Sequence, residues 1–231
     1  MSLETLLGLL LVLVLPALQM GRSLRPETSP KTRLSRYWQT IAIATGLMAM
    51  LAVVWSASGR DLETLGFDSP ISKAGLIGLG LAFCLLIALA AATLVRTPKT
   101  SDADGAALAM LPATTAELCV FVAFSCIVGL AWETLYRGYL MWWLEPRLGT
   151  AFAVVVAAMA YGLGHGVKNM RQTLGSLLAA FAFTIGFVLT RSLLWLILLH
   201  AGLPMISVLA MRVMRRAGIG ELPPAVVGQM E

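Results

Sequence analysis

Long apolar stretches dominate this sequence of 231 residues, and they restrict its fold more than any other feature does. A helix that spans a bilayer needs about 20 apolar residues. The mean hydropathy is +0.84 and 13% of the residues are charged, against about 25% in a typical soluble domain. The sequence therefore predicts an all-α polytopic transmembrane bundle, forming a single integral membrane domain over residues 1–231. We expect about seven spanning helices, at residues 3–20, 37–57, 71–95, 116–143, 151–166, 174–190 and 192–211.

Basic residues are distributed unequally between the two sides that seven spans would create. Segments 21–36, 96–114 and 167–173 and the C-terminal tail hold most of the Lys and Arg residues. The opposite loops hold Arg60, Lys73, Arg147 and Arg191. Since the more basic side faces the cytoplasm, we predict a cytoplasmic C-terminus and an external N-terminus, in a bacterial plasma membrane. The connection at residues 190–192 is so short that the last two helices could instead be one broken element.

Charge and cysteine content exclude two classes of function. The net charge of +5 is modest, so we expect membrane lipid rather than nucleic acid as the partner of the basic residues. The chain has three cysteines, Cys84, Cys119 and Cys126, and no pair of them has the spacing of a thiolate metal site. We interpret them as small apolar residues at helix interfaces.

Four ionisable side chains lie inside the apolar stretches, where charge is costly and usually functional. Glu133 and Arg137 are four residues apart and share one face of a predicted helix. His165 ends the run Tyr161-Gly-Leu-Gly-His, and His200 follows seven apolar residues. Glutamate and histidine are common proton carriers in hydrolysis, so the sequence indicates a catalytic site. The alternative is structural, with a Glu133–Arg137 ion pair that locks its helix and histidines that only satisfy hydrogen bonds.

These residues resemble the motifs of the CPBP family of intramembrane proteases, which includes the CAAX prenyl endopeptidases of the Rce1 type. The family pattern is Glu-Glu-x-x-x-Arg, then Phe-x-x-x-His, then His-x-x-x-Asn, and the resemblance covers about residues 116–211, the motif-bearing core. It implies hydrolysis of peptide bonds in a membrane-associated or prenylated protein substrate. In the family the first Glu and the first His activate water, the second His and the Asn stabilise the oxyanion, and the second Glu, which Glu133 matches, supports the site with the Arg. For this chain we predict an atypical site in which Glu133 and His165 activate water, His200 donates to the oxyanion, and Arg137 supports the site.

Two positions depart strongly from the family pattern, and Tyr161 in place of Phe is a mild third departure. Trp132 stands where the family has its first Glu, and Pro204 stands where it has Asn. A second hypothesis is therefore a catalytically degenerate CPBP-fold protein that acts as a scaffold, an immunity factor or a peptide-binding factor. A third is an unrelated transporter or membrane assembly factor, with the histidines in a proton path.

The resemblance also bears on cofactors and on the geometry of the site. Chemistry by glutamate and water needs no cofactor, although two His and one Glu could hold a divalent metal such as zinc. With a rise of about 1.5 Å per residue, straight perpendicular helices would not bring Glu133, His165 and His200 to one depth. Helix tilt, or a break at Gly162 or Gly164, would allow them to meet.

Overall fold

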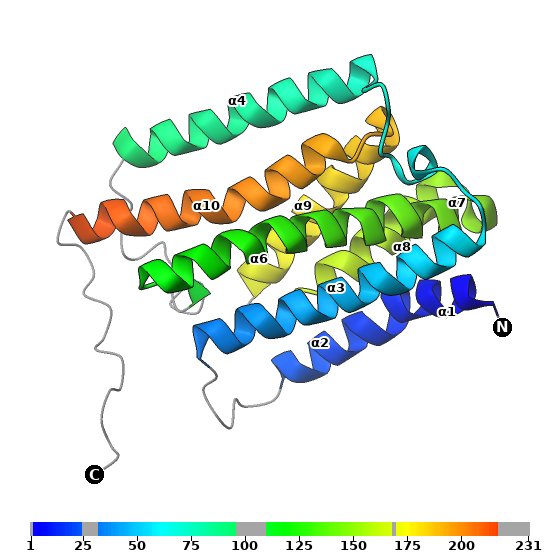
Figure 1. The fold of residues 1–231 in the computed structure, drawn as a ribbon, viewed down its shortest axis with the longest axis horizontal. Helices are drawn as coiled ribbons and strands as arrows, with labels where there is room; N and C mark the ends of the chain where they lie inside the picture. The colour runs from blue at the N-terminus through cyan, green and yellow to red at the C-terminus, as the bar shows by residue number, and fades with distance from the viewer. Residues whose placement is uncertain (1, 25–31, 96–109, 168–169, 217–231) are drawn as a thin grey trace, which may run out of the picture.

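The computed structural model describes residues 2–24, 32–95, 110–167 and 170–216, and these residues form helices with no strand among them. This confirms the predicted all-α architecture (Figure 1). The elements are α1 (Leu3–Leu9), η1 (Leu10–Val14), α2 (Leu15–Ser23), α3 (Arg33–Ala57), η2 (Leu62–Leu65), α4 (Lys73–Val95), α6 (Thr115–Glu133), η4 (Thr134–Leu140), α7 (Met141–Leu148), α8 (Thr150–Leu163), α9 (Met170–Thr190) and α10 (Leu194–Arg216).

Each predicted apolar stretch is a helix, but the seven differ in length. Within the described residues, six helices are long and apolar enough to cross a bilayer, at Leu3–Ser23, Arg33–Ala57, Lys73–Val95, Thr115–Leu148, Met170–Thr190 and Leu194–Arg216. The seventh, α8, has 14 residues and a length of about 21 Å at 1.5 Å per residue. That is shorter than the bilayer core of about 30 Å, and α8 ends at Leu163 rather than at the predicted residue 166.

The last two predicted helices are separate elements and not one broken helix. α9 ends at Thr190, Arg191 has a positive φ of 52°, and α10 begins at Leu194. The fourth predicted helix is longer than expected, because α6, η4 and α7 are continuous from Thr115 to Leu148 and pass through Pro146. In Figure 1, α10 lies between α4 and α6, and α3 packs on the other side of α6.

The first span is bonded to the middle of the bundle through a carbonyl that Pro16 leaves free. η1 is a π-helical turn in which the N–H of Leu15 donates to the carbonyl of Leu10, five residues earlier. At that spacing the next donor would be residue 16, but proline has no N–H. The carbonyl of Leu11 instead accepts a hydrogen bond of 3.2 Å from the hydroxyl of Tyr136. Tyr139 donates similarly to the carbonyl of Glu4, at 2.5 Å.

The connection between α3 and α4 is hydrogen-bonded to the start of α10. The N–H of Leu193 donates to the carbonyl of Gly66 at 2.8 Å, and the Ser192 hydroxyl donates to Asp68 Oδ1 at 2.8 Å. The other oxygen of Asp68 accepts from the N–H of Ser72 at 2.7 Å. Burial raises the pKa of Asp68, but the hydrogen bonds from Ser72 and Ser192 outweigh it and hold that pKa below its ordinary value. This connection therefore covers the ends of η4 and α10.

Candidate active site

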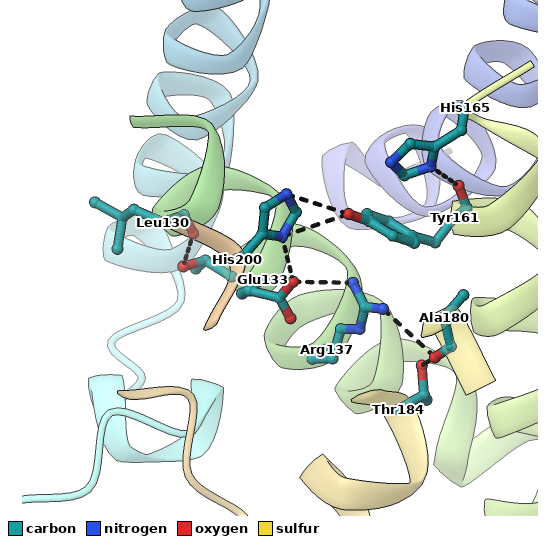
Figure 2. A network of polar contacts seen from close by, with 9 residues as sticks. Leu130, Glu133, Arg137, Tyr161, His165, Ala180, Thr184 and His200 are labelled. Carbon is teal, nitrogen blue, oxygen red and sulfur yellow. Dashed lines mark hydrogen bonds and ion pairs between the residues drawn. The ribbon is translucent and has the colours of Figure 1, made fainter. Parts of the chain in front are cut away.

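A close crossing of α6 and α10 places two of the predicted catalytic residues in contact. A Cβ atom on Gly129 would lie 3.1 Å from the backbone nitrogen of Ala201, so glycine permits this approach of the two helices. Glu133 lies one turn after Gly129, and His200 is next to Ala201. Figure 2 shows the result, in which His200 Nδ1 lies 2.6 Å from Glu133 Oε1. The structure thus joins two residues 67 positions apart in the sequence.

Glu133 and Arg137 form an ion pair that is sealed from solvent. Arg137 Nη1 lies 3.3 Å from Glu133 Oε1, and both side chains are 0% exposed. Arg137 Nη2 also donates to the carbonyl of Ala180 at 3.4 Å, and its Cζ lies 4.0 Å from the centre of the Tyr161 ring. A buried carboxylate is tolerated only when it is paired, so Arg137 has the supporting position that the sequence predicts.

The pair lies where the helix changes from α to π geometry. α6 ends at Glu133, and η4 runs from Thr134 to Leu140 as a π-helical turn with every residue buried. Such turns are rare and are frequent at functional sites. The change alters the direction of the side chains that follow Glu133, so Arg137 points toward α8 and α9 rather than along an ideal α-helical row.

One oxygen of the Glu133 carboxylate has no partner among the described residues. Glu133 Oε1 accepts hydrogen bonds from both His200 and Arg137, whereas the buried Oε2 accepts none from the described residues. An unsatisfied buried oxygen is costly and retains the capacity to accept a hydrogen bond from water or substrate. The site is therefore polar and only partly satisfied.

His165 reaches this cluster through Tyr161 and not through direct contact with Glu133. α8 ends at Leu163, between the two glycines at which a break was expected, and His165 lies exposed in the turn that follows. Its Nδ1 donates to the carbonyl of Tyr161 at 3.1 Å, and its ring packs at 4.7 Å from the Tyr161 ring. The hydroxyl of Tyr161 lies 3.4 Å from both ring nitrogens of His200.

The two residues that depart from the family pattern have different surroundings. Trp132 is partly buried against the core, and its ring centre lies 6.1 Å from that of Tyr136. Pro204 lies inside α10, one turn after His200. Neither residue has a side-chain hydrogen-bonding group that could replace the Glu or the Asn of the pattern; the indole N–H of Trp132 donates but cannot accept a proton as a base does.

Sequence reasoning did not identify two polar groups of the site. The family pattern has Phe at the position of Tyr161, so the pattern predicts no hydroxyl there. An alanine side chain gives no indication that the backbone carbonyl of Ala180 accepts a hydrogen bond from Arg137. The hydroxyl of Thr184 donates to the same carbonyl at 2.7 Å. Thr184 is a polar residue within the apolar stretch at residues 174–190, and this feature of the sequence indicates a polar contact there.

The donor set for the alternative zinc site is incomplete. Within residues 2–24, 32–95, 110–167 and 170–216, no three His, Cys, Asp or Glu side chains lie together as metal ligands. Zinc in catalytic sites commonly uses three such protein ligands. Glu133 and His200 approach each other, but Glu133 Oε1 is also occupied by Arg137. The residues present therefore do not fit a zinc site.

A hollow on another part of the molecule is separate from this cluster. Its volume is about 610 Å³, and its lining includes Asp61, Glu63, Asp68 and Leu194 but none of the predicted catalytic residues. It lies beside the connection between α3 and α4. We therefore assign the candidate active site from the contacts around Glu133 and not from this hollow.

Comparison with known proteins gives one match. Residues 114–206 match the family model described as type II CAAX prenyl endopeptidase Rce1-like. The matched segment contains Glu133, Arg137, Tyr161, His165 and His200, and it nearly coincides with the motif-bearing core predicted at residues 116–211. No curated protein and no solved structure matches the chain.

Proposed function

We propose that this chain, which carries an Rce1-like domain at residues 114–206, is an intramembrane endopeptidase of the CAAX prenyl protease type. The observation that carries the proposal is the 2.6 Å contact between His200 Nδ1 and Glu133 Oε1 in the interior of the bundle. A carboxylate bonded to one nitrogen of an imidazole orients the ring and stabilises its protonated form. Glu133 and His200 are therefore the pair to which we assign catalysis.

The proposed reaction uses the second nitrogen of His200 as a general base. With Nδ1–H donated to Glu133, Nε2 carries the lone pair and takes a proton from water. The water oxygen bonds to the scissile carbonyl carbon, and the π electron pair of the carbonyl moves to its oxygen. The tetrahedral intermediate then collapses, the C–N bond breaks, and the proton on Nε2 passes to the leaving nitrogen. Arg137 balances the charge of Glu133 throughout.

This assignment changes the roles that the family resemblance implies for the two histidines. The contact with Glu133 supports His200 as the base, whereas the resemblance pairs Glu133 with His165. His165 keeps a place in the proposal as a second imidazole beside Tyr161. Because its Nδ1 donates to the carbonyl of Tyr161, its Nε2 is free to accept a hydrogen bond from the attacking water or a peptide N–H.

The proposed substrate is a membrane-associated or prenylated protein, cleaved by the chain in a bacterial plasma membrane. The family match supports this substrate class, and the apolar helices around Glu133 favour a lipid-borne peptide. We propose that the reaction needs no cofactor, since a side chain of this protein can carry each proton transfer. The alternative zinc enzyme would lose activity with a chelator and regain it with added zinc.

The experiment is cleavage of a fluorogenic prenylated peptide by the purified full-length protein in detergent, with product masses measured. We expect Glu133→Gln and His200→Ala each to lower kcat by about 10²–10⁴-fold, the contribution of general acid–base catalysis. Glu145→Gln is the matched control, because Glu145 is ion-paired with Arg191 outside the site, and it should retain full activity. Full cleavage by either site variant would disprove the assignment.

A second candidate function is favoured by Trp132 and Pro204. A protein with these residues could bind a peptide in an Rce1-like domain without cleaving it, and act as a scaffold or an immunity factor. Trp132→Glu, alone and with Pro204→Asn, distinguishes the two functions. Cleavage that appears only in these variants would identify the natural protein as a binding protein, whereas cleavage by the unaltered chain supports the peptidase.

A further inference from the structure

We propose that the hydroxyl of Tyr161 is a catalytic hydrogen-bond donor, which binds the oxyanion that forms when water adds to the scissile carbonyl. The inference rests on the proposed peptidase function and adds one residue to its site. Oxyanion stabilisation by fixed donors is a large term in acyl-transfer catalysis. Tyr161 is suited to this role because its hydroxyl faces His200, makes no short hydrogen bond, and is carried by a ring that its neighbours hold in place.

The Tyr161 hydroxyl faces the proposed base and is not committed to a strong hydrogen bond. It lies 3.4 Å from both Nδ1 and Nε2 of His200, whereas a good O–H hydrogen bond is about 2.7–2.8 Å long. Because the two distances are equal, the hydroxyl favours neither nitrogen (Figure 2). The neighbouring hydroxyls of Tyr136 and Tyr139 instead donate to backbone carbonyls of the first span.

The ring of Tyr161 is held in place on several sides. The guanidinium carbon of Arg137 lies 4.0 Å from the ring centre. The ring of Tyr136 lies 5.2 Å away edge-on, and the ring of His165 lies 4.7 Å away. A donor fixed before the reaction costs no reorganisation in the transition state. Tyr161 thus presents its hydroxyl at a defined point beside His200.

The other polar groups around His200 are already engaged. The Nδ1 proton of His200 points to Glu133, and Nε2 serves as the base. Arg137 is 0% exposed and is bonded to Glu133 and to the carbonyl of Ala180. Pro204, one turn after His200 on α10, has neither an N–H nor a donor side chain. The Tyr161 hydroxyl is therefore the donor beside His200 that remains for the oxyanion.

The test is Tyr161→Phe, which removes the hydroxyl and keeps the ring that packs on Arg137. In the peptide-cleavage assay we expect kcat to fall by about 10²-fold, as for loss of one oxyanion donor, with KM and thermal unfolding unchanged. Tyr139→Phe is the matched control, because its hydroxyl donates to the carbonyl of Glu4 in the first span and its ring is not one of those that hold Tyr161, and it should retain kcat. An unchanged kcat, or a change confined to KM, would overturn the role of Tyr161.

A rescue variant separates a donor from a merely structural tyrosine. Pro204→Asn places an amide on the same face of α10 as His200. We expect it to raise kcat more in the Tyr161→Phe background than in the unaltered chain. An equal effect in both backgrounds would overturn the proposal. If the unaltered chain cleaves no peptide, the proposed function fails and this role fails with it; if it cleaves and Tyr161→Phe cleaves equally, the Tyr161 role alone fails.

Discussion

At the scale of single residues, the pairing of Arg137 with Glu133 decides whether the site can exist in an apolar interior. Both side chains are 0% exposed, and Arg137 also contacts Tyr161 and the carbonyl of Ala180. Removing one partner of a buried ion pair leaves an uncompensated charge, whereas replacing both with neutral groups is often tolerated. Arg137 therefore compensates the buried charge of Glu133, and its loss is expected to destabilise the folded protein.

Arg137→Met should lower the free energy of unfolding by about 3–5 kcal/mol, because Glu133 would remain buried without its partner. The double variant Glu133→Gln with Arg137→Met should recover most of this loss. Arg191→Met is the matched control: Arg191 forms an exposed ion pair with Glu145, and such a pair is worth about 0–1 kcal/mol. Unfolding of the purified protein in detergent measures all three, and a double variant as unstable as Arg137→Met would contradict the argument.

At the scale of elements, the contact between η2 and η4 holds the connection between α3 and α4 against the π-helical turn. A Cβ atom on Gly138 would lie 2.7 Å from the backbone carbonyl oxygen of Leu65 and 3.4 Å from Leu193 Cδ1. Backbone on one side and a buried leucine on the other leave little room to adjust. Glycine at this position therefore sets how closely the π-helical turn and the connection approach.

Gly138→Ala should destabilise the protein by about 1–3 kcal/mol, the usual cost of overpacking a close contact. Gly80→Ala is the matched control, because a Cβ atom there meets nothing within 4 Å, and it should not be destabilised, since alanine favours a helix over glycine. The measurement is again unfolding in detergent, together with protease cleavage of the connection between α3 and α4. Equal stabilities for the two variants would show that the connection can move away at little cost.

The elements also show which parts of the structure the sequence can predict. Apolar length identified all seven helices, because burial in a bilayer requires an unbroken run of apolar residues. It could not predict that α8 would end at Leu163, since the Gly-Leu-Gly run allows a helix end at several positions. The rare glutamate, arginine and histidines indicated a polar cluster, and the structure brings Glu133, Arg137 and His200 into contact, with His165 beside Tyr161. The Glu133–Arg137 pair follows from its spacing of four residues. The contact of Glu133 with His200 depends on the α6–α10 crossing, which has no signal in a single sequence.

At the scale of the whole molecule, the unequal distribution of basic residues predicts its orientation. Arg212, Arg215 and Arg216 lie at the end of the last span, and Arg60 lies in the connection between α3 and η2. Retention of Lys and Arg in the cytoplasm sets orientation through the energetics of insertion. The prediction of a cytoplasmic C-terminus extends to a tail whose last residues, 217–231, lie outside the described residues.

A fluorescent protein that matures only in the cytoplasm should be bright when fused to the C-terminus. The same reporter inserted after Gly59 should be dark, and a phosphatase active only outside should show the opposite pattern. Both results follow from the positive-inside rule. A C-terminal fusion that is dark but well expressed would reverse the orientation and would place the connection between α3 and α4 in the cytoplasm.

The carbonyl of Leu11 couples two distant positions, Pro16 and Tyr136, because both determine which hydrogen bond this carbonyl accepts. A residue other than proline at position 16 would supply an N–H that competes with the hydroxyl of Tyr136 for that carbonyl. Phenylalanine at position 136 would leave the carbonyl bare while Pro16 remained. A substitution at Pro16 therefore changes the surroundings of Tyr136, so a mutation in the first span reaches η4 without altering any residue of the matched segment.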